Sequence, residues 1–188
     1  MKFLTPEEAR KWCEAHGMRV AVDGFLYYET LERNALLIEL TEKPSRIIAL
    51  ANYLVPAWSP DSFQGAIVWI SDWGIGDDDS ERTGSTIIEQ MRAACGEQRP
   101  LSEAPGMLFG QNEMAEMYSY FVLPLIFGWD AFVVPIGQDY FVFVSHDEVV
   151  SLVSSTTKAH EEALKRLKDW GPKEDTWYLK TFEPVLPK

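Results

Sequence analysis

Apolar and polar residues recur along the chain with two different periods, and this pattern predicts separate helices and strands. The clearest helix is LTPEEARKWCEAHG, in which Thr5 caps the N-terminus, Glu8 completes a capping box and Gly17 ends the helix. Helical spacing of apolar residues predicts four further helices, in KPSRIIALANYLVP, STIIEQMRAACG, NEMAEMYSYFVLPLIF with Asn112 as its cap, and Lys158–Trp170.

Runs rich in β-branched and aromatic residues predict the strands. Arg19–Glu29 and Ala35–Thr41 are expected to pair as a hairpin across the polar turn ERN. The apolar run Gly65–Trp73 is typical of a central strand that is buried on both faces. DAFVVPI and DYFVFVSH are predicted to form a hairpin joined at GQ, with DEVVSLVSS as a third strand. EQRPLSEAPGMLFG is expected to be an irregular connection.

Helices and hairpins mixed in this order predict an α+β fold, with a largely antiparallel sheet packed against helices. The 188 residues, 46% of them hydrophobic, are enough to bury one core, so we expect a single domain over 1–188 with its tail, 171–188, docked. Two cysteines are too few for a disulfide framework and indicate a reducing compartment. The N-terminus does not resemble a signal peptide, which favours a cytoplasmic location.

The charge is strongly acidic, with 29 acidic residues against 17 basic ones and a formal net charge of −12. Phosphate binding needs clustered Lys and Arg, so nucleic acid is not an expected partner. The longest apolar stretch, YFVLPLIFGW, is too short to span a membrane. Asp61–Met117 alone carries eleven acidic residues and three arginines. This concentration fits either a charge that keeps the protein soluble or a docking face for a basic protein partner.

The segment YFVFVSHDEVV places Ser145, His146 and Asp147 side by side, as the residue types of a hydrolase triad. Neighbouring side chains of a strand point to opposite faces, so these three residues cannot form a triad with one another. No G-x-S-x-G motif occurs in the chain. We therefore expect the strand to end here, with Ser145 or Asp147 capping a turn and His146 bonded to nearby backbone.

A catalytic or ligand pocket remains an alternative, because the fold could bring reactive residues together from separate segments. The residues proposed for it are His146, Asp147, Asp130 and Cys95. Of the other reactive residues, Cys13 is expected in the core, His16 at a helix C-terminus, and His160 on a solvated helix face.

The acidic loop GIGDDDSERTG offers carboxylate oxygens to a cation such as Ca²⁺, but its spacing does not match an EF-hand, which needs Gly at the sixth and Glu at the twelfth position. Counted from Asp77, these positions hold Arg82 and Ile88. The loop also lacks a dinucleotide or P-loop phosphate motif. The sequence therefore predicts neither a metal site nor a cofactor.

Aromatic and acidic residues do occur together, as they do in protein interfaces. The predicted partner-binding set consists of Trp73, Asp77, Asp78, Asp79 and Glu81. The competing interpretation is a core built on large aromatic side chains, with Asp residues at the turns.

Four segments, ISDWGIG, EAPGMLFG, FGWDAFVVP and YFVFVSHDE, resemble a group of small acidic bacterial proteins over about residues 68–150. The resemblance implies landmark positions and no activity; these positions are Trp73, Pro105, Gly106, Trp129, Asp130, His146 and Asp147. In size and acidity the chain is also similar in type to immunity proteins that neutralise bacterial toxins.

Two hypotheses follow from these patterns. The first is a non-enzymatic module, similar to an immunity protein, that docks a basic protein through its acidic region. The second is a small-ligand or hydrolytic domain with a pocket around His146. A homo-oligomer, formed through the aromatic strands, is a weaker third alternative.

Overall fold

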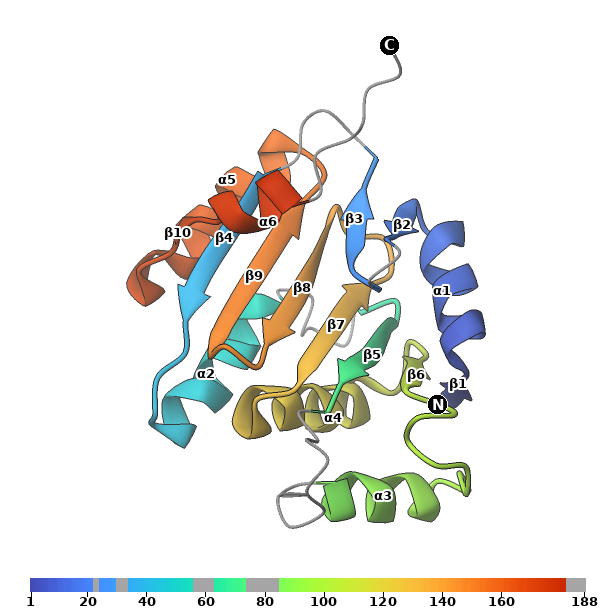
Figure 1. Ribbon diagram of the computed structural model, residues 1–188. Coiled ribbons are helices and arrows are strands. Elements are labelled where there is room, and N and C mark those ends of the chain that lie inside the picture. The colour runs from blue at the N-terminus through green and yellow to red at the C-terminus, as the bar shows by residue number, and fades with distance from the viewer. Residues whose placement is uncertain (22–23, 30–33, 56–62, 74–84, 182–188) are drawn as a thin grey trace.

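The computed structural model describes residues 1–21, 24–29, 34–55, 63–73 and 85–181 (Figure 1). Eight described strands form one sheet, and every neighbouring pair in it is antiparallel. Their order across the sheet is β1 (Lys2–Leu4), β6 (Gly106–Phe109), β5 (Ala66–Asp72), β7 (Asp130–Pro135), β8 (Tyr140–Ser145), β9 (Val149–Ser154), β4 (Asn34–Glu39) and β10 (Lys173–Glu174). The predicted α+β class with a largely antiparallel sheet is confirmed.

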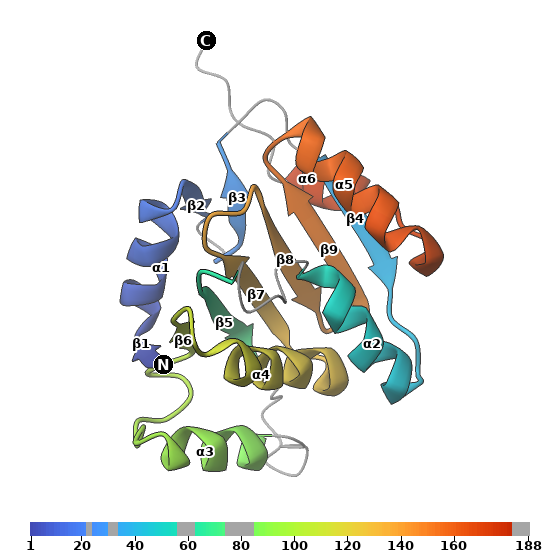
Figure 2. The same cartoon turned by 180° about the vertical axis from the view of Figure 1, so that it is seen from behind.

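Helices cover both faces of this sheet (Figures 1 and 2). Behind it in Figure 1, and in front in Figure 2, lie α2 (Pro44–Leu54), α4 (Met114–Phe127) and α5 (Thr157–Leu167), the last followed by the short helix η2 (Lys168–Trp170). The other face packs against α1 (Pro6–Ala15), α6 (Thr176–Thr181) and a separate two-stranded hairpin of β2 (Met18–Val20) and β3 (Leu26–Tyr28). Helix α3 (Ser85–Ala94) lies beyond the end of the sheet.

The central strands divide their side chains between the two cores, as period-two alternation requires. In β8, Val142 and Val144 face the core under α2, α4 and α5, whereas Phe141 and Phe143 face the opposite core. On that second face the rings of Phe132 and Phe143 stack with their centroids 4.9 Å apart. Every residue of β7 and β8 is buried, so these strands are held firmly from both sides.

The capping signals predicted from the sequence hold for α1 but not for α4. Thr5 and Glu8 form the capping box of α1, with reciprocal bonds of 2.9 and 3.2 Å. The prediction of Asn112 as the cap of α4 is wrong, because Glu113 occupies that position. Its carboxylate accepts from the Gly110 amide at 2.7 Å and from the N-terminal amino group of Met1, so it ties β1 to α4.

The predicted hairpin between Arg19–Glu29 and Ala35–Thr41 is wrong. The first of these segments pairs with itself, as β2 and β3, while β4 joins the large sheet between β9 and β10. The structure also forms β1 and β6, which were not predicted. Gly106 allows this pairing, since a Cβ at that position would lie 3.1 Å from the Cβ atoms of both Ala9 and Leu4.

The described part of the C-terminal segment packs against the sheet through β10 and α6. Tyr178 is 1% exposed, and its hydroxyl donates to the carbonyl of Leu26. Among the described residues no helix is both long and apolar enough to cross a bilayer.

Candidate functional site

The site is built around the turn between β8 and β9, residues 146–148. Ser145 ends β8, and its hydroxyl accepts a hydrogen bond from the Asp147 amide at 3.2 Å. Of the two residues predicted to cap this turn, Ser145 or Asp147, it is therefore Ser145 that does so. Glu148 adopts a positive φ of 60°, a conformation that three-residue hairpin turns normally assign to Gly. The Glu148 carbonyl accepts from the Leu40 amide at 2.8 Å, which fixes the turn against the chain that leaves β4.

The prediction that His146 bonds to nearby backbone is wrong. The carboxylate of Asp130 holds His146 instead. Oδ1 of Asp130 accepts from the His146 amide at 2.7 Å and from ring Nδ1 at 2.9 Å, so Nδ1 carries the ring proton. Asp130 is 9% exposed, whereas 53% of the His146 side chain is exposed. The pKa of His146 is raised, chiefly by this hydrogen bond and by the negative charge of Asp130.

Two more carboxylates surround this pair. Asp72 stands opposite Asp130 across β5 and β7, immediately after a bulge in the register at Ile70 and Asp72. One ligand atom from each of Asp72, Asp130 and His146 lies within 4.8 Å of the others. Oδ1 of Asp147 lies 3.7 Å from Nε2 of His146. The structure therefore brings together three of the four residues proposed for a catalytic pocket.

Cys95, the fourth, is not part of this group. It follows the last residue of α3 and is exposed. Its neighbour is Tyr120 in α4, a phenol whose pKa is raised by burial and by the nearby Cys95 thiol. Tyr120 lies about two turns along α4 from Phe127, the end of the helix nearest His146.

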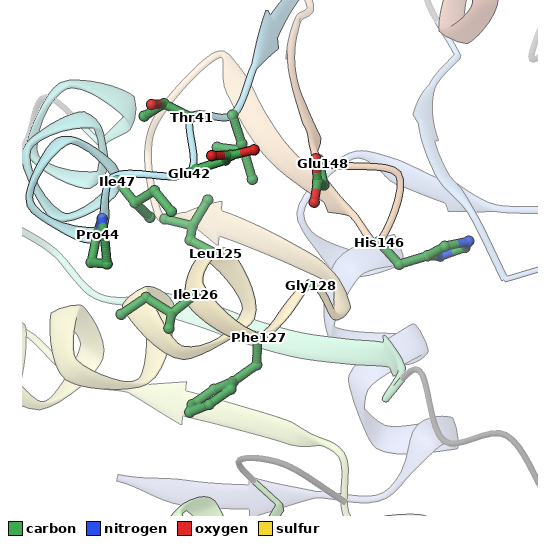
Figure 3. A pocket seen from close by; sticks show the side chains of 11 residues that line it. Thr41, Glu42, Pro44, Ile47, Leu125, Ile126, Phe127, Gly128, His146 and Glu148 are labelled. Carbon is green, nitrogen blue, oxygen red and sulfur yellow. The ribbon is translucent and has the colours of Figure 1, made fainter. Parts of the chain in front are cut away.

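A cleft of about 370 Å³ lies on the other side of the same turn (Figure 3). It is lined by residues of β4, α2, α4 and the turn: Leu40, Thr41, Glu42, Pro44, Ile47, Leu125, Ile126, Phe127, Gly128, His146 and Glu148. Ile47 and Leu125 belong to the buried core beneath it. The cleft thus has an apolar base.

Figure 3 shows how the polar side chains of the cleft are directed. Glu42 and Glu148 point toward the space above Leu125, whereas the imidazole of His146 turns away from it. Both glutamates are exposed. None of the described residues that line the cleft is a Lys or an Arg, so its charge is negative.

The predicted partner-binding set is only partly described. Trp73 is partly buried, and its ring lies 5.3 Å from that of the buried Trp129. Trp73 therefore contributes to the core as well as to the surface. Asp77, Asp78, Asp79 and Glu81 lie outside the described residues.

The remaining reactive side chains belong to α1, its C-cap and α5 rather than to this site. Cys13 is fully buried, which raises its thiol pKa to about 12 and confirms its place in the core. His16 ends α1, where its ring stacks on Trp12 and its Nδ1 lies 2.7 Å from the Trp12 carbonyl. His160 is partly exposed and its Nδ1 is buried, so the expectation of a solvated side chain is met only in part.

Comparison of the chain with models of protein families, with curated proteins and with solved structures finds no match. The site must therefore be interpreted from its own geometry. The sequence did not predict Glu42, Glu148 or Asp72 as site residues. The sequence feature that could have identified them is that each lies close to the end of a strand. In the structure, the pairings β4–β9 and β5–β7 bring those ends together.

Proposed function

We propose that the protein is a binding module that docks a basic protein partner at the cleft between α2, α4 and the β8–β9 turn. The observation that carries this proposal is that Glu42 and Glu148 both point toward the space above an apolar base. No Lys or Arg is among the described residues that line this cleft. An acidic, half-apolar cleft is complementary to a long basic side chain.

An inserted Lys or Arg would use both features of the cleft. Its aliphatic stem would pack on Ile47 and Leu125, and its charged end would reach the two carboxylates. Hydrogen bonds to charged groups contribute about 1.5–3 kcal/mol each when they are shielded from water. The neighbouring Asp72, Asp130 and Asp147 would add long-range attraction, which speeds association with a basic surface.

The backbone at Glu148 supports a binding role. A non-glycine residue with positive φ is strained by about 1–2 kcal/mol, and such strain clusters at functional sites. Glycine would relieve the strain but remove a carboxylate from the cleft.

The same geometry favours docking over hydrolysis. His146 has an orienting carboxylate, but its imidazole turns away from the cleft in which a substrate would lie. In type, the proposed function is that of an immunity protein, which neutralises a basic toxin by covering it. The free thiols Cys13 and Cys95 support a reducing, cytoplasmic setting for this function.

A defined probe tests the proposal. A fluorescent peptide of alternating Arg and Leu is titrated with the full chain at low and at high salt, and fluorescence anisotropy is recorded. We expect saturable binding that weakens with salt and falls about tenfold in the double variant Glu42→Gln/Glu148→Gln, a change of about 1.4 kcal/mol.

The matched control is Glu103→Gln/Glu161→Gln, which removes the same charge from two exposed residues outside the cleft. This variant should retain most of the affinity. Equal losses in the two double variants, or equal binding of a peptide with Glu in place of Arg, would contradict docking at the cleft.

A further inference from the structure

We infer that Asp72, Asp130 and His146 form a binding site for a divalent transition-metal ion, independent of the proposed docking function. The three side chains offer one imidazole nitrogen and two carboxylates, with ligand atoms within 4.8 Å of one another. They come from β5, β7 and the β8–β9 turn, so the sheet itself sets their spacing.

The spacing fits a shared ion. Metal–nitrogen and metal–oxygen bonds of about 2.0–2.2 Å place adjacent ligand atoms about 3 Å apart in an octahedral site. Nδ1 of His146 and Oδ1 of Asp130 are 2.9 Å apart in a hydrogen bond, so an ion bound to Nδ1 would replace the proton between them, and the neutral ring would then carry its proton on Nε2. The ligand atoms of the group spread over at most 4.8 Å, so a shared ion requires only small adjustments of side chains, and both His146 and Asp72 are exposed.

Asp130 supplies the fixed point of the site. Its backbone lies in β7, where both faces of the sheet are buried, and Asp130 is only 9% exposed. Both hydrogen bonds from His146 end on Oδ1, and no described residue donates to Oδ2. A largely buried carboxylate therefore keeps Oδ2 as a possible ligand atom, while Oδ1 can retain its bond from the His146 amide.

The charge around His146 favours a cation. Asp72, Asp130 and Asp147 place three carboxylates beside one imidazole, and even a protonated ring balances only one of them. A divalent ion would offset two charges at once.

The donor set selects the class of ion. Imidazole nitrogen together with carboxylate oxygen suits Zn²⁺, Mn²⁺, Fe²⁺, Co²⁺ or Ni²⁺, whereas Ca²⁺ and Mg²⁺ prefer sites made only of oxygen. Three protein ligands leave coordination positions for water, for Asp147 or for a group supplied by a partner.

The test is calorimetric titration of the metal-free, untagged full chain with ZnCl₂. Every protein carries Cys95→Ser, because an exposed thiol is itself a zinc ligand. We expect one saturable site per chain, weakened at least about tenfold by His146→Ala or by Asp72→Asn. The matched control, His160→Ala combined with Asp169→Asn, should leave the affinity unchanged.

A spectroscopic measurement keeps the test independent of misfolded variants. In the folded Cys95→Ser protein, ZnCl₂ should shift the ring resonances of His146 and leave those of His16 and His160 in place. Saturable binding that survives both substitutions, or an absence of binding up to about 1 mM ZnCl₂, would overturn the proposal.

Discussion

Two buried aspartates, Asp175 and Asp130, show how the same residue type serves stability in one region of the sheet and leaves a reactive surface in another. They are 1% and 9% exposed, and each begins or precedes a secondary-structure element. Burying a carboxylate is unfavourable unless hydrogen bonds compensate for the lost water. The two sites differ in the groups that provide those bonds.

Asp175 is surrounded by groups that do not titrate near neutral pH. Oδ1 accepts from the Tyr178 amide at 2.9 Å, and Oδ2 accepts from the hydroxyl of Ser151. Its own amide donates to the Ala35 carbonyl at 2.9 Å. Both carboxylate oxygens are therefore occupied, and the residue fastens α6 and the end of β10 to the sheet.

Asp130 uses one oxygen for both of its bonds, and both come from His146, whose ring is half exposed. Asp72 and Asp147 lie around the same ring and repel additional negative charge. The difference teaches that burial alone does not identify a structural carboxylate. The partner groups, and the oxygen left without a donor, decide whether a site can bind something else.

The largest expected effect is a loss of stability when Asp175 is replaced. Asp175→Ala removes the cap of α6 and leaves the buried Ser151 hydroxyl without its acceptor, so we expect a loss of about 2–4 kcal/mol in the free energy of unfolding. Urea denaturation measures it. Asp169→Ala, at an exposed position, is the control and should change stability by less than about 0.5 kcal/mol. Similar losses in the two variants would show that Asp175 is not a structural anchor.

A smaller effect of opposite sign, a gain in stability, is expected at Glu148 in the β8–β9 turn. Glu148→Gly relieves the positive φ, partly offset by the greater freedom of Gly in the unfolded chain, for a net gain of about 0.5–1 kcal/mol in unfolding free energy. The same change should weaken the binding of the Arg/Leu peptide, because it removes one of the two carboxylates of the cleft. Glu148→Asn, which tolerates this backbone conformation, separates strain from charge. A loss of stability in Glu148→Gly would mean that the Glu148 side chain is structural.

The smallest effect on stability is expected at Asp130. Asp130→Asn keeps the shape and the acceptor oxygen but removes the charge that raises the pKa of His146. In metal-free protein, NMR titration of the His146 ring should give a lower pKa in the variant than in the parent chain. An unchanged pKa would show that the contact does not form in solution.

The sign of the pH effect also follows. Because the folded-state pKa of His146 lies above its unfolded value, its contribution to stability is present below that unfolded pKa and is lost as pH rises through the folded pKa. Asp130→Asn should flatten this part of the stability profile, as read from urea denaturation at several pH values. No flattening would contradict the coupling of the two residues.

Local patterns predicted the fold class and most elements. The capping box of Thr5 and Glu8 and the apolar strand around Val68 depend on residues that are close in the sequence. Both predictions are confirmed by the structure. The predicted hairpin failed because the partner of β4 is β9, more than a hundred residues away, and non-local pairing leaves no local signal. Strands β1 and β6 were missed because short strands carry too few residues to show a period.

The candidate site was predictable only in part. His146, Asp147 and Asp130 were identified as reactive residues near strand ends, and the β7–β8 hairpin brings them together. The contribution of Asp72 depends on the β5–β7 register, and that of Glu42 on the β4–β9 pairing, neither of which can be derived from local spacing. The positive φ of Glu148 runs against the preference of its residue type, so only the structure reveals it.

The central claim, that a basic partner docks in the cleft, is tested most directly by mapping amide chemical shifts in ¹⁵N-labelled protein during titration with the Arg/Leu peptide. The account predicts that the amides shifting most strongly are those of Thr41, Glu42, Gly128 and Glu148, which line the cleft from three sides. Shifts concentrated on α5 and β10, or none at saturating peptide, would contradict it.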